Sequence, residues 1–203
     1  MIKQIPNILT GGRLVLSIVF LVMILLEPRL PADRDMSFPS YLDLAFVIFL
    51  IAAFTDMADG AMARKLNVTS KFGRMVDPLA DKVLICGSFI FFLSWDPLRP
   101  FLASWMVLVI VVREFTVHGL RTIAESKGVS FGANIWGKQK TFVQCTTVIW
   151  SLVYVIYLRH LAQHSWSEIL LQALIWLTIF TTVFSALTYF YKIRKMLRQV
   201  TEE

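Results

Sequence analysis

The chain has 203 residues, of which 57% are hydrophobic and 17% are charged, and its mean hydropathy is +0.65. This composition excludes a soluble globular enzyme, a secreted disulfide scaffold and a disordered tail. At about 20 residues for each transmembrane helix, the length leaves room for about six helices and short loops. Cys86 and Cys145 lie in apolar runs and are predicted to be small buried side chains.

Six apolar stretches follow one another along the chain, each about as long as a bilayer requires. They cover residues 8–26, 41–63, 78–95, 101–120, 141–158 and 169–191. We expect six helices, because the strands of an outer-membrane barrel are shorter and alternate apolar with polar residues. A cleavable signal peptide is the alternative for the first stretch, but no small-residue cleavage site follows Leu26. The sequence therefore predicts a single all-α integral membrane domain over residues 1–203.

Positively charged residues predict how these helices are oriented. The N-terminus, the 64–74 and 121–140 loops and the C-terminal tail hold fourteen of the twenty Lys and Arg residues, whereas the opposite loops hold four. Because cytoplasmic loops carry the excess of cations, both termini are predicted to be cytoplasmic. The net charge of +6 then reflects this bias and an attraction to anionic membrane lipids, and we expect no nucleic-acid partner.

Four carboxylates lie inside or at the edge of predicted membrane helices: Asp56, Asp59, Asp77 and Asp81. Each such charge costs about 2.5–3.5 kcal/mol near the middle of a membrane helix, so the cluster needs a compensating cation. Asp56 and Asp59 share one helix face, and Asp77 and Asp81 share another that includes Gly73 if the third helix extends that far. Because a short loop joins the two helices, all four carboxylates are expected to face one another at the cytoplasmic end.

Carboxylate oxygens without nearby His or Cys ligands are the donors that hard cations prefer, and two ions would balance four negative charges. We therefore predict a site for two Mg²⁺ or Mn²⁺ ions, an arrangement that indicates phosphoryl transfer. Gly60 and Ala63 would let a nucleotide or pyrophosphate approach the helix backbone, although close helix packing explains small residues equally well. Arg64 is placed to bind phosphate. Lys82 is expected to pair with an aspartate or to reach the membrane surface.

The segment DMADGAMARKLNVTSKFGRMVDPLAD fits the pattern DxxDGxxARx₈Gx₃Dx₃D at every fixed position. It resembles the signature of the CDP-alcohol phosphotransferase family. The further strings IPNILTGGR, DPLADK, REFTVHGLR and WGKQKT are similar to the phosphatidylglycerophosphate synthase branch of that family. The resemblance extends over most of the chain. It departs at Gly11 and Gly12, where similar proteins usually carry bulkier residues.

The resemblance implies roles for individual residues. Asp56, Asp59 and Asp77 would ligate the metal ions, and Asp81 would be both a ligand and the general base. The residues implied around the cytidine diphosphate part of the donor are Asn7, Thr10, Asp56, Asp59, Gly60, Ala63, Arg64 and Gly73. The implied reaction is attack of an alcohol on the lipid-side phosphorus of CDP-diacylglycerol, with CMP leaving. The resemblance also implies a homodimer in a bacterial-type cytoplasmic membrane, with the active site facing the cytoplasm.

A second polar cluster is expected to select the acceptor. Arg113 and Glu114 lie in the fourth helix, where unpaired charges are costly, and Arg121 lies two turns further on. Together with Lys138 and Lys140, the two arginines would suit an acceptor that carries a phosphate, such as glycerol 3-phosphate. Positive-inside topology alone also explains the two lysines. We expect Glu114 to orient Arg113 or a neighbouring helix.

Three hypotheses follow for the function. The first is transfer of the phosphatidyl group from CDP-diacylglycerol to glycerol 3-phosphate, giving phosphatidylglycerophosphate and CMP, with inositol phosphate, serine or phosphatidylglycerol as alternative acceptors. The second is an intramembrane prenyltransferase, which also uses aspartates, Mg²⁺ and pyrophosphate but has no role for the DGxxAR segment. The third is a cation transporter, which is disfavoured because the aspartates cluster at one end and the sequence has no inverted repeat.

Overall fold

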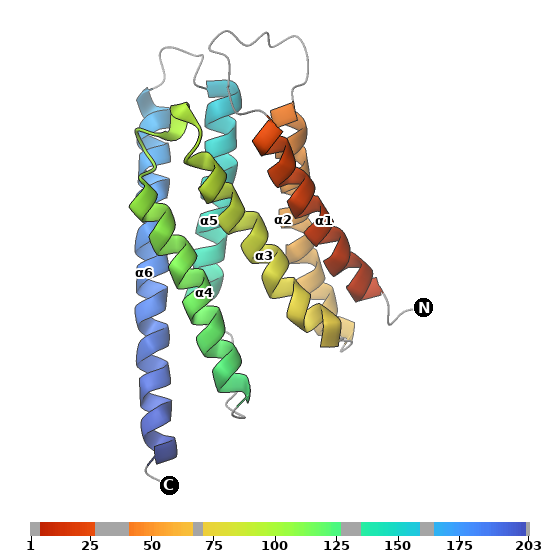
Figure 1. The fold of residues 1–203 in the computed structure, drawn as a ribbon, viewed down its shortest axis with the longest axis vertical. Coiled ribbons are helices and arrows are strands. Elements are labelled where there is room, and N and C mark those ends of the chain that lie inside the picture. The colour runs from red at the N-terminus through yellow and green to blue at the C-terminus, as the bar shows by residue number, and fades with distance from the viewer. Residues whose placement is uncertain (1–4, 27–40, 67–70, 127–134, 159–164, 202–203) are drawn as a thin grey trace.

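The structure, a computed structural model, describes residues 5–26, 41–66, 71–126, 135–158 and 165–201, with side chains described for residues 11–26, 41–55, 80–124, 137, 139–158, 166–191 and 194. This part of the chain is helical throughout, apart from the connection between the third and fourth long helices, and has no strand (Figure 1). The long helices are α1 (Ile5–Leu26), α2 (Tyr41–Leu66), α3 (Lys71–Phe92), α4 (Ser104–Ser126), α5 (Ile135–Val153) and α6 (Ser165–Thr201). A 3₁₀ turn, η2 (Asp96–Leu98), precedes α4, and a π-helical turn, η3 (Tyr154–Leu158), extends α5.

Successive helices run in opposite directions along the long axis of the molecule (Figure 1). The first turn of α1 and the last turn of α6 therefore lie at the same end, which we call the terminal end. Helix α1 packs against both α2 and α3, while α6 packs against α4 and α5. Helix α3 also contacts α4 and α5, so it joins the two groups of helices.

Two helix boundaries differ from the predicted apolar stretches in a way that matters for the site. Helix α3 begins at Lys71 rather than near Pro78, because helical structure continues through polar turns that a hydropathy argument leaves out. Gly73 therefore belongs to the same helix as Asp77 and Asp81, as the predicted shared face requires. We call this face of α3, and the face of α2 that carries Asp56 and Asp59, the two predicted stripes. Helix α4 begins at Ser104, after η2, whose second residue is Pro97, rather than at residue 101.

The packing of α1 against α2 and α3 depends on apolar side chains and on one glycine. Phe20 and Phe49 contact each other across α1 and α2 with ring centroids 5.2 Å apart. At Gly87 in α3, an added Cβ would lie 2.6 Å from Cδ1 of Leu21 in α1. This distance is well below van der Waals contact, so a larger residue at position 87 would push the two helices apart or displace Leu21.

The surface of the helices is rich in large apolar side chains. Exposed examples on α1, α4 and α6 are Val15, Ile18, Val22, Leu108, Val112, Phe115, Trp176, Phe180 and Leu187. Within the described residues, two stretches are long and apolar enough to cross a membrane, Gln139–Leu158 and Trp166–Tyr191, and two shorter apolar ones are Gly11–Leu26 and Tyr41–Thr55. Apolar faces of this extent are unfavourable in water. They are consistent with a membrane protein.

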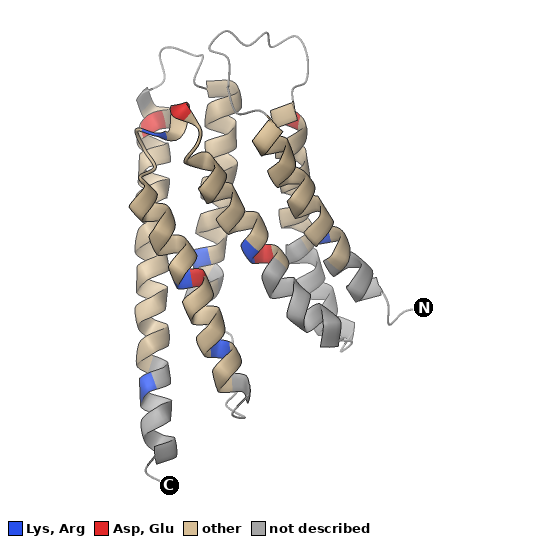
Figure 2. Cartoon of the chain, viewed as in Figure 1, with Lys and Arg blue, Asp and Glu red and all other residues tan. Residues whose placement is uncertain are grey.

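Charged residues are distributed unevenly between the two ends of the bundle (Figure 2). Among the described side chains, the cations lie from the middle of the bundle toward the terminal end, except Arg99. Arg99 follows η2 at the opposite end, where it is exposed and forms a 3.4 Å ion pair with Asp96. Among the described cations, Arg13 on α1 and Lys140 on α5 are buried, and Lys82 on α3 and Arg113 on α4 are partly buried, so these four need an explanation.

Candidate active site

The metal and donor residues predicted from the sequence lie on α1, α2 and α3. Helix α2 is continuous through residues 56–64 and α3 through residues 73–81, so both stripes have the helical phase that the prediction assumes. Nine of these residues have side chains outside the described set: Asn7, Thr10, Asp56, Asp59, Gly60, Ala63, Arg64, Gly73 and Asp77. Asp81 is described and is half-buried. No three His, Cys, Asp or Glu side chains of the described set gather, and the metal site stays a prediction.

Gly11 and Gly12, the departure from the resemblance, lie on α1. A Cβ added at either position meets no atom within 4 Å. A methyl group would therefore fit at both positions. Close packing within the described part of the chain does not require glycine at either one.

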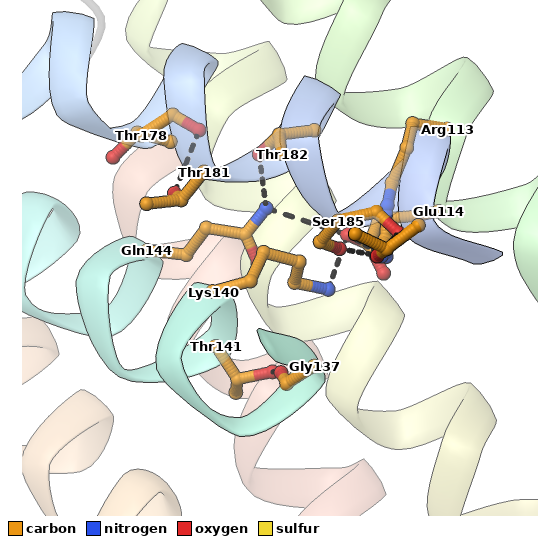
Figure 3. A network of polar contacts seen from close by, with 11 residues as sticks. Arg113, Glu114, Gly137, Lys140, Thr141, Gln144, Thr178, Thr181, Thr182 and Ser185 are labelled. Carbon is orange, nitrogen blue, oxygen red and sulfur yellow. Dashed lines mark hydrogen bonds and ion pairs between the residues drawn. The ribbon is translucent and has the colours of Figure 1, made fainter. Parts of the chain in front are cut away.

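A buried polar network joins α4, α5 and α6 (Figure 3). Its centre is Oε1 of Glu114, which accepts hydrogen bonds from Nη1 of Arg113 at 3.2 Å, from Nζ of Lys140 and from Nε2 of Gln144 at 3.4 Å. Two residues of α6 complete it. Nη2 of Arg113 donates to Oγ of Ser185, and Nε2 of Gln144 lies 3.4 Å from Oγ1 of Thr182. We call these six residues the cation network: Arg113, Glu114, Lys140, Gln144, Thr182 and Ser185.

The cation network forms where helical spacing brings polar side chains to facing surfaces. Lys140 and Gln144 are one turn apart on α5, and Thr182 and Ser185 are three residues apart on α6, so each pair lies on one helix face. Glu114 on α4 projects between them (Figure 3). Charges enclosed by a helical bundle persist only when they are paired and hydrogen-bonded, and Glu114 supplies the negative partner.

The cation network holds more positive charge and more N–H donors than its own acceptors satisfy. Arg113 and Lys140 carry two positive charges against the single charge of Glu114, and their side chains are only 10% and 6% exposed. Arg113 has five N–H donors and Lys140 has three. Nε of Arg113 is buried and has no hydrogen-bond partner among the described residues. This excess of donors fits a phosphate group, whose several oxygens accept hydrogen bonds.

The cation network lies close to the predicted metal stripe of α3. Lys82 interacts electrostatically with the adjacent Asp81 and also with Glu114 and Lys140. Helix α3 contacts both α4 and α5, in agreement with these interactions. Lys82 therefore lies near the cation network, and whether it pairs with an aspartate or reaches the membrane surface stays a prediction.

The structure brings together two of the four predicted acceptor residues. Arg113 and Lys140 meet at Glu114, which confirms the expectation that Glu114 orients Arg113. Positive-inside topology does not explain a buried Lys140. Arg121 is exposed two turns further along α4, and the side chain of Lys138 lies outside the described set.

Sequence reasoning missed the uncharged members of the cation network, Gln144, Thr182 and Ser185. Their signal is a run of polar residues at helical spacing inside apolar stretches. On α5 it continues beyond Gln144 with Thr147, whose hydroxyl lies 2.7 Å from that of Thr178 on α6. All five side chains are buried. Polar contacts between α5 and α6 therefore continue beyond the charged residues, as far as Thr147 and Thr178.

The profile of the CDP-alcohol phosphatidyltransferase family matches residues 3–184. The chain belongs to this family. Both predicted stripes and five residues of the cation network lie within the matched segment, and Ser185 is the first residue after it.

Individual relatives match over nearly their whole lengths. The CDP-diacylglycerol–glycerol-3-phosphate 3-phosphatidyltransferase of Bacillus subtilis is 37% identical over 193 residues, which are 93% of this chain and 94% of that protein. The protein of the same name in Rickettsia felis is 30% identical over 95% of this chain and 97% of its own length. That of Rickettsia typhi is 29% identical, with 93% and 96% covered.

Proposed function

We propose that the protein transfers the phosphatidyl group of CDP-diacylglycerol to glycerol 3-phosphate, giving phosphatidylglycerophosphate and CMP. The observation that carries this proposal is the similarity to relatives named for that reaction, which extends over more than nine-tenths of both chains. The complete DxxDGxxARx₈Gx₃Dx₃D signature supports the same conclusion, since its four aspartates belong to two continuous helices, α2 and α3.

In the proposed reaction, a hydroxyl oxygen of glycerol 3-phosphate attacks the lipid-side phosphorus of the diphosphate. A new P–O bond forms as the bond to CMP breaks, and CMP leaves with the electron pair. Asp81 takes the hydroxyl proton during the attack, since a carboxylate within hydrogen-bond reach makes an alcohol a better nucleophile. Asn7, Thr10, Gly60, Ala63, Arg64 and Gly73 bind the cytidine diphosphate part together with Asp56 and Asp59.

The chemistry of the donor set fits two divalent cations, Mg²⁺ or Mn²⁺, held by Asp56, Asp59, Asp77 and Asp81. When bound, these ions neutralise the diphosphate and stabilise CMP as the leaving group. The part played by the chain itself is to hold four carboxylates on two helices. Arg64, one turn beyond Gly60 on α2, adds a positive side chain for a phosphate.

The cation network supports an acceptor that carries its own phosphate. Arg113 and Lys140 bind that phosphate, and Arg121 and Lys138 complete the positive surface around it. The support comes from burial, because two enclosed cations that share one carboxylate retain a net positive charge and unsatisfied N–H donors. An uncharged alcohol would not balance that charge.

The protein is proposed to cross the membrane six times, once with each long helix, as a homodimer. Both termini and the active site then face the cytoplasm of a bacterial-type cell. The alternating helix directions and the exposed apolar faces support this topology. The location of the described cations from mid-bundle to the terminal end supports the orientation.

The purified protein in detergent or lipid, supplied with CDP-diacylglycerol and Mg²⁺, tests the reaction. Glycerol 3-phosphate, inositol phosphate, serine and phosphatidylglycerol are offered separately, and CMP release is measured. We expect CMP with glycerol 3-phosphate and not with the others. Asp81→Asn, purified in parallel, excludes a contaminating enzyme. No CMP with any acceptor would reject the enzyme, and CMP only with an uncharged alcohol would reject the role of the cation network.

A further inference from the structure

The contact between Arg113 and Ser185 joins two residues that are far apart in the sequence. Arg113 lies in the middle of α4, and Ser185 lies on α6, where its side chain is buried. The hydroxyl oxygen of Ser185 accepts a hydrogen bond from Nη2 of Arg113, and the two side chains point toward each other in Figure 3. The other terminal nitrogen, Nη1, donates to Glu114. The two ends of the guanidinium group are therefore held by two different helices.

This arrangement fixes the orientation of a planar group. Holding both terminal nitrogens of an arginine prevents the plane from rotating about its long side chain. The edge that carries Nε then keeps one direction, and Nε of Arg113 is buried and has no hydrogen-bond partner among the described residues. An arginine commonly binds a phosphate through two parallel N–H groups, which requires a fixed plane.

We propose that Ser185 is a positioning residue for the acceptor: its hydroxyl holds Arg113 so that the edge of the guanidinium group with Nε faces the phosphate of glycerol 3-phosphate. The proposal rests on the proposed function. It adds Ser185, a residue of α6, to those that determine acceptor affinity. Ser185 does not touch the donor or the reacting atoms in this scheme. Its loss should therefore weaken acceptor binding and leave the chemical step and donor binding unchanged.

Ser185→Ala removes the hydrogen-bond acceptor and tests the proposal. We expect KM for glycerol 3-phosphate to rise about tenfold, the scale of one hydrogen bond to a charged group, with kcat and KM for CDP-diacylglycerol changed less than about twofold. Ser185→Cys, which is similar in size but a weak acceptor, should give the same result and replaces the alanine variant if that protein does not fold. Ser185→Thr keeps a hydroxyl and should retain most of the affinity.

Ser151 provides a matched control. It is 2% exposed, as Ser185 is, but its hydroxyl donates to the backbone oxygen of Thr147 in its own helix at 2.8 Å. Ser151→Ala creates the same small cavity in the bundle without touching Arg113. We expect its KM for glycerol 3-phosphate to match that of the unaltered protein, so that a general packing defect is separated from loss of positioning.

Equilibrium binding of radiolabelled glycerol 3-phosphate separates this proposal from the proposed function, because it needs no turnover. Weaker binding of glycerol 3-phosphate to Ser185→Ala than to Ser151→Ala supports the positioning role. If that result is found and the unaltered protein releases no CMP, the proposed function alone fails. Three results would overturn the role of Ser185: unchanged acceptor affinity in both the Ala and Cys variants, an equal loss in Ser151→Ala, or no binding of glycerol 3-phosphate to the unaltered protein.

Discussion

The predicted metal stripes and the cation network are distributed along the chain in different ways. The four aspartates lie between positions 56 and 81, on two helices joined by a short loop, whereas the cation network spans Arg113 to Ser185 and draws on three helices. Metal ligands must recur at fixed spacing because one group of ions binds them all. A network of buried charges needs only that each charge finds a partner after folding. The first kind of site is therefore predicted from the sequence as a whole, whereas the sequence predicts only the charged residues of the second and not their uncharged partners.

Removing divalent cations should have the largest effect on activity. It should affect the predicted metal site of the four aspartates and not the cation network. We expect a chelator to abolish CMP release, because the diphosphate then lacks charge neutralisation, and Mg²⁺ or Mn²⁺ to restore it. Acceptor binding to the cation network should persist, since its charges come from side chains. Binding of radiolabelled glycerol 3-phosphate with and without chelator measures this. Full activity in chelator would contradict the two-metal prediction.

Asp81→Asn should lower kcat by about 100- to 10,000-fold, the usual contribution of a general base. The amide keeps a side-chain oxygen but cannot take the hydroxyl proton, so binding of CDP-diacylglycerol should be largely retained. The measurements are kcat and donor affinity. Asp96→Asn is the control, because Asp96 is exposed in η2 at the opposite end of the bundle. Equal losses of donor binding and turnover at position 81 would argue against a general base.

Arg113→Ala should raise KM for glycerol 3-phosphate by about 10- to 100-fold, the scale of a lost charge-assisted hydrogen bond, with KM for CDP-diacylglycerol unchanged. The cation network would also lose one partner of Glu114. Steady-state kinetics with each substrate varied in turn measures the split. Arg121→Ala serves for comparison, because Arg121 is exposed on the same helix. We expect a smaller effect there, and equal effects would show that burial in the cation network does not matter.

Thr147→Val should have the smallest effect, and it separates helix packing from acceptor binding. The change removes the 2.7 Å contact with Thr178 and should lower the free energy of unfolding by about 0.6 kcal/mol, the average for hydrogen bonds between membrane helices. Thermal unfolding of the purified protein measures the loss. Thr146→Val, whose hydroxyl donates to the backbone oxygen of Phe142 in its own helix, is the control. Kinetic constants should be unchanged in both variants.

The sequence predicted the six long helices of the described chain because each coincides with one of the six apolar stretches, although only two of these are long and apolar enough within the described residues to cross a membrane. It did not predict that α3 begins at Lys71, since polar turns before Pro78 carry no hydropathy signal. The pairing of Arg113 with Glu114 was foreseen because charges in a membrane helix need partners.

The partners from α5 and α6 were harder to predict. Gln144, Thr182 and Ser185 are ordinary polar residues, and no spacing rule relates residues on different helices. The polar repeat of Lys140, Gln144 and Thr147 marks one face of α5 and would have indicated a buried polar surface. It would not have identified Ser185 as the partner of Arg113, because that contact depends on how α4 and α6 pack.

A larger residue at Gly87 would have to displace Leu21 or tilt α1 at this contact. Eleven residues separate Leu21 from Thr10, so this arm of the helix is about 16 Å long. A tilt of about 5° at the contact would move Thr10 by more than about 1 Å at the far end of that arm. If Asn7 and Thr10 bind the cytidine moiety as proposed, a side chain added at position 87 would displace that site without itself contacting the donor.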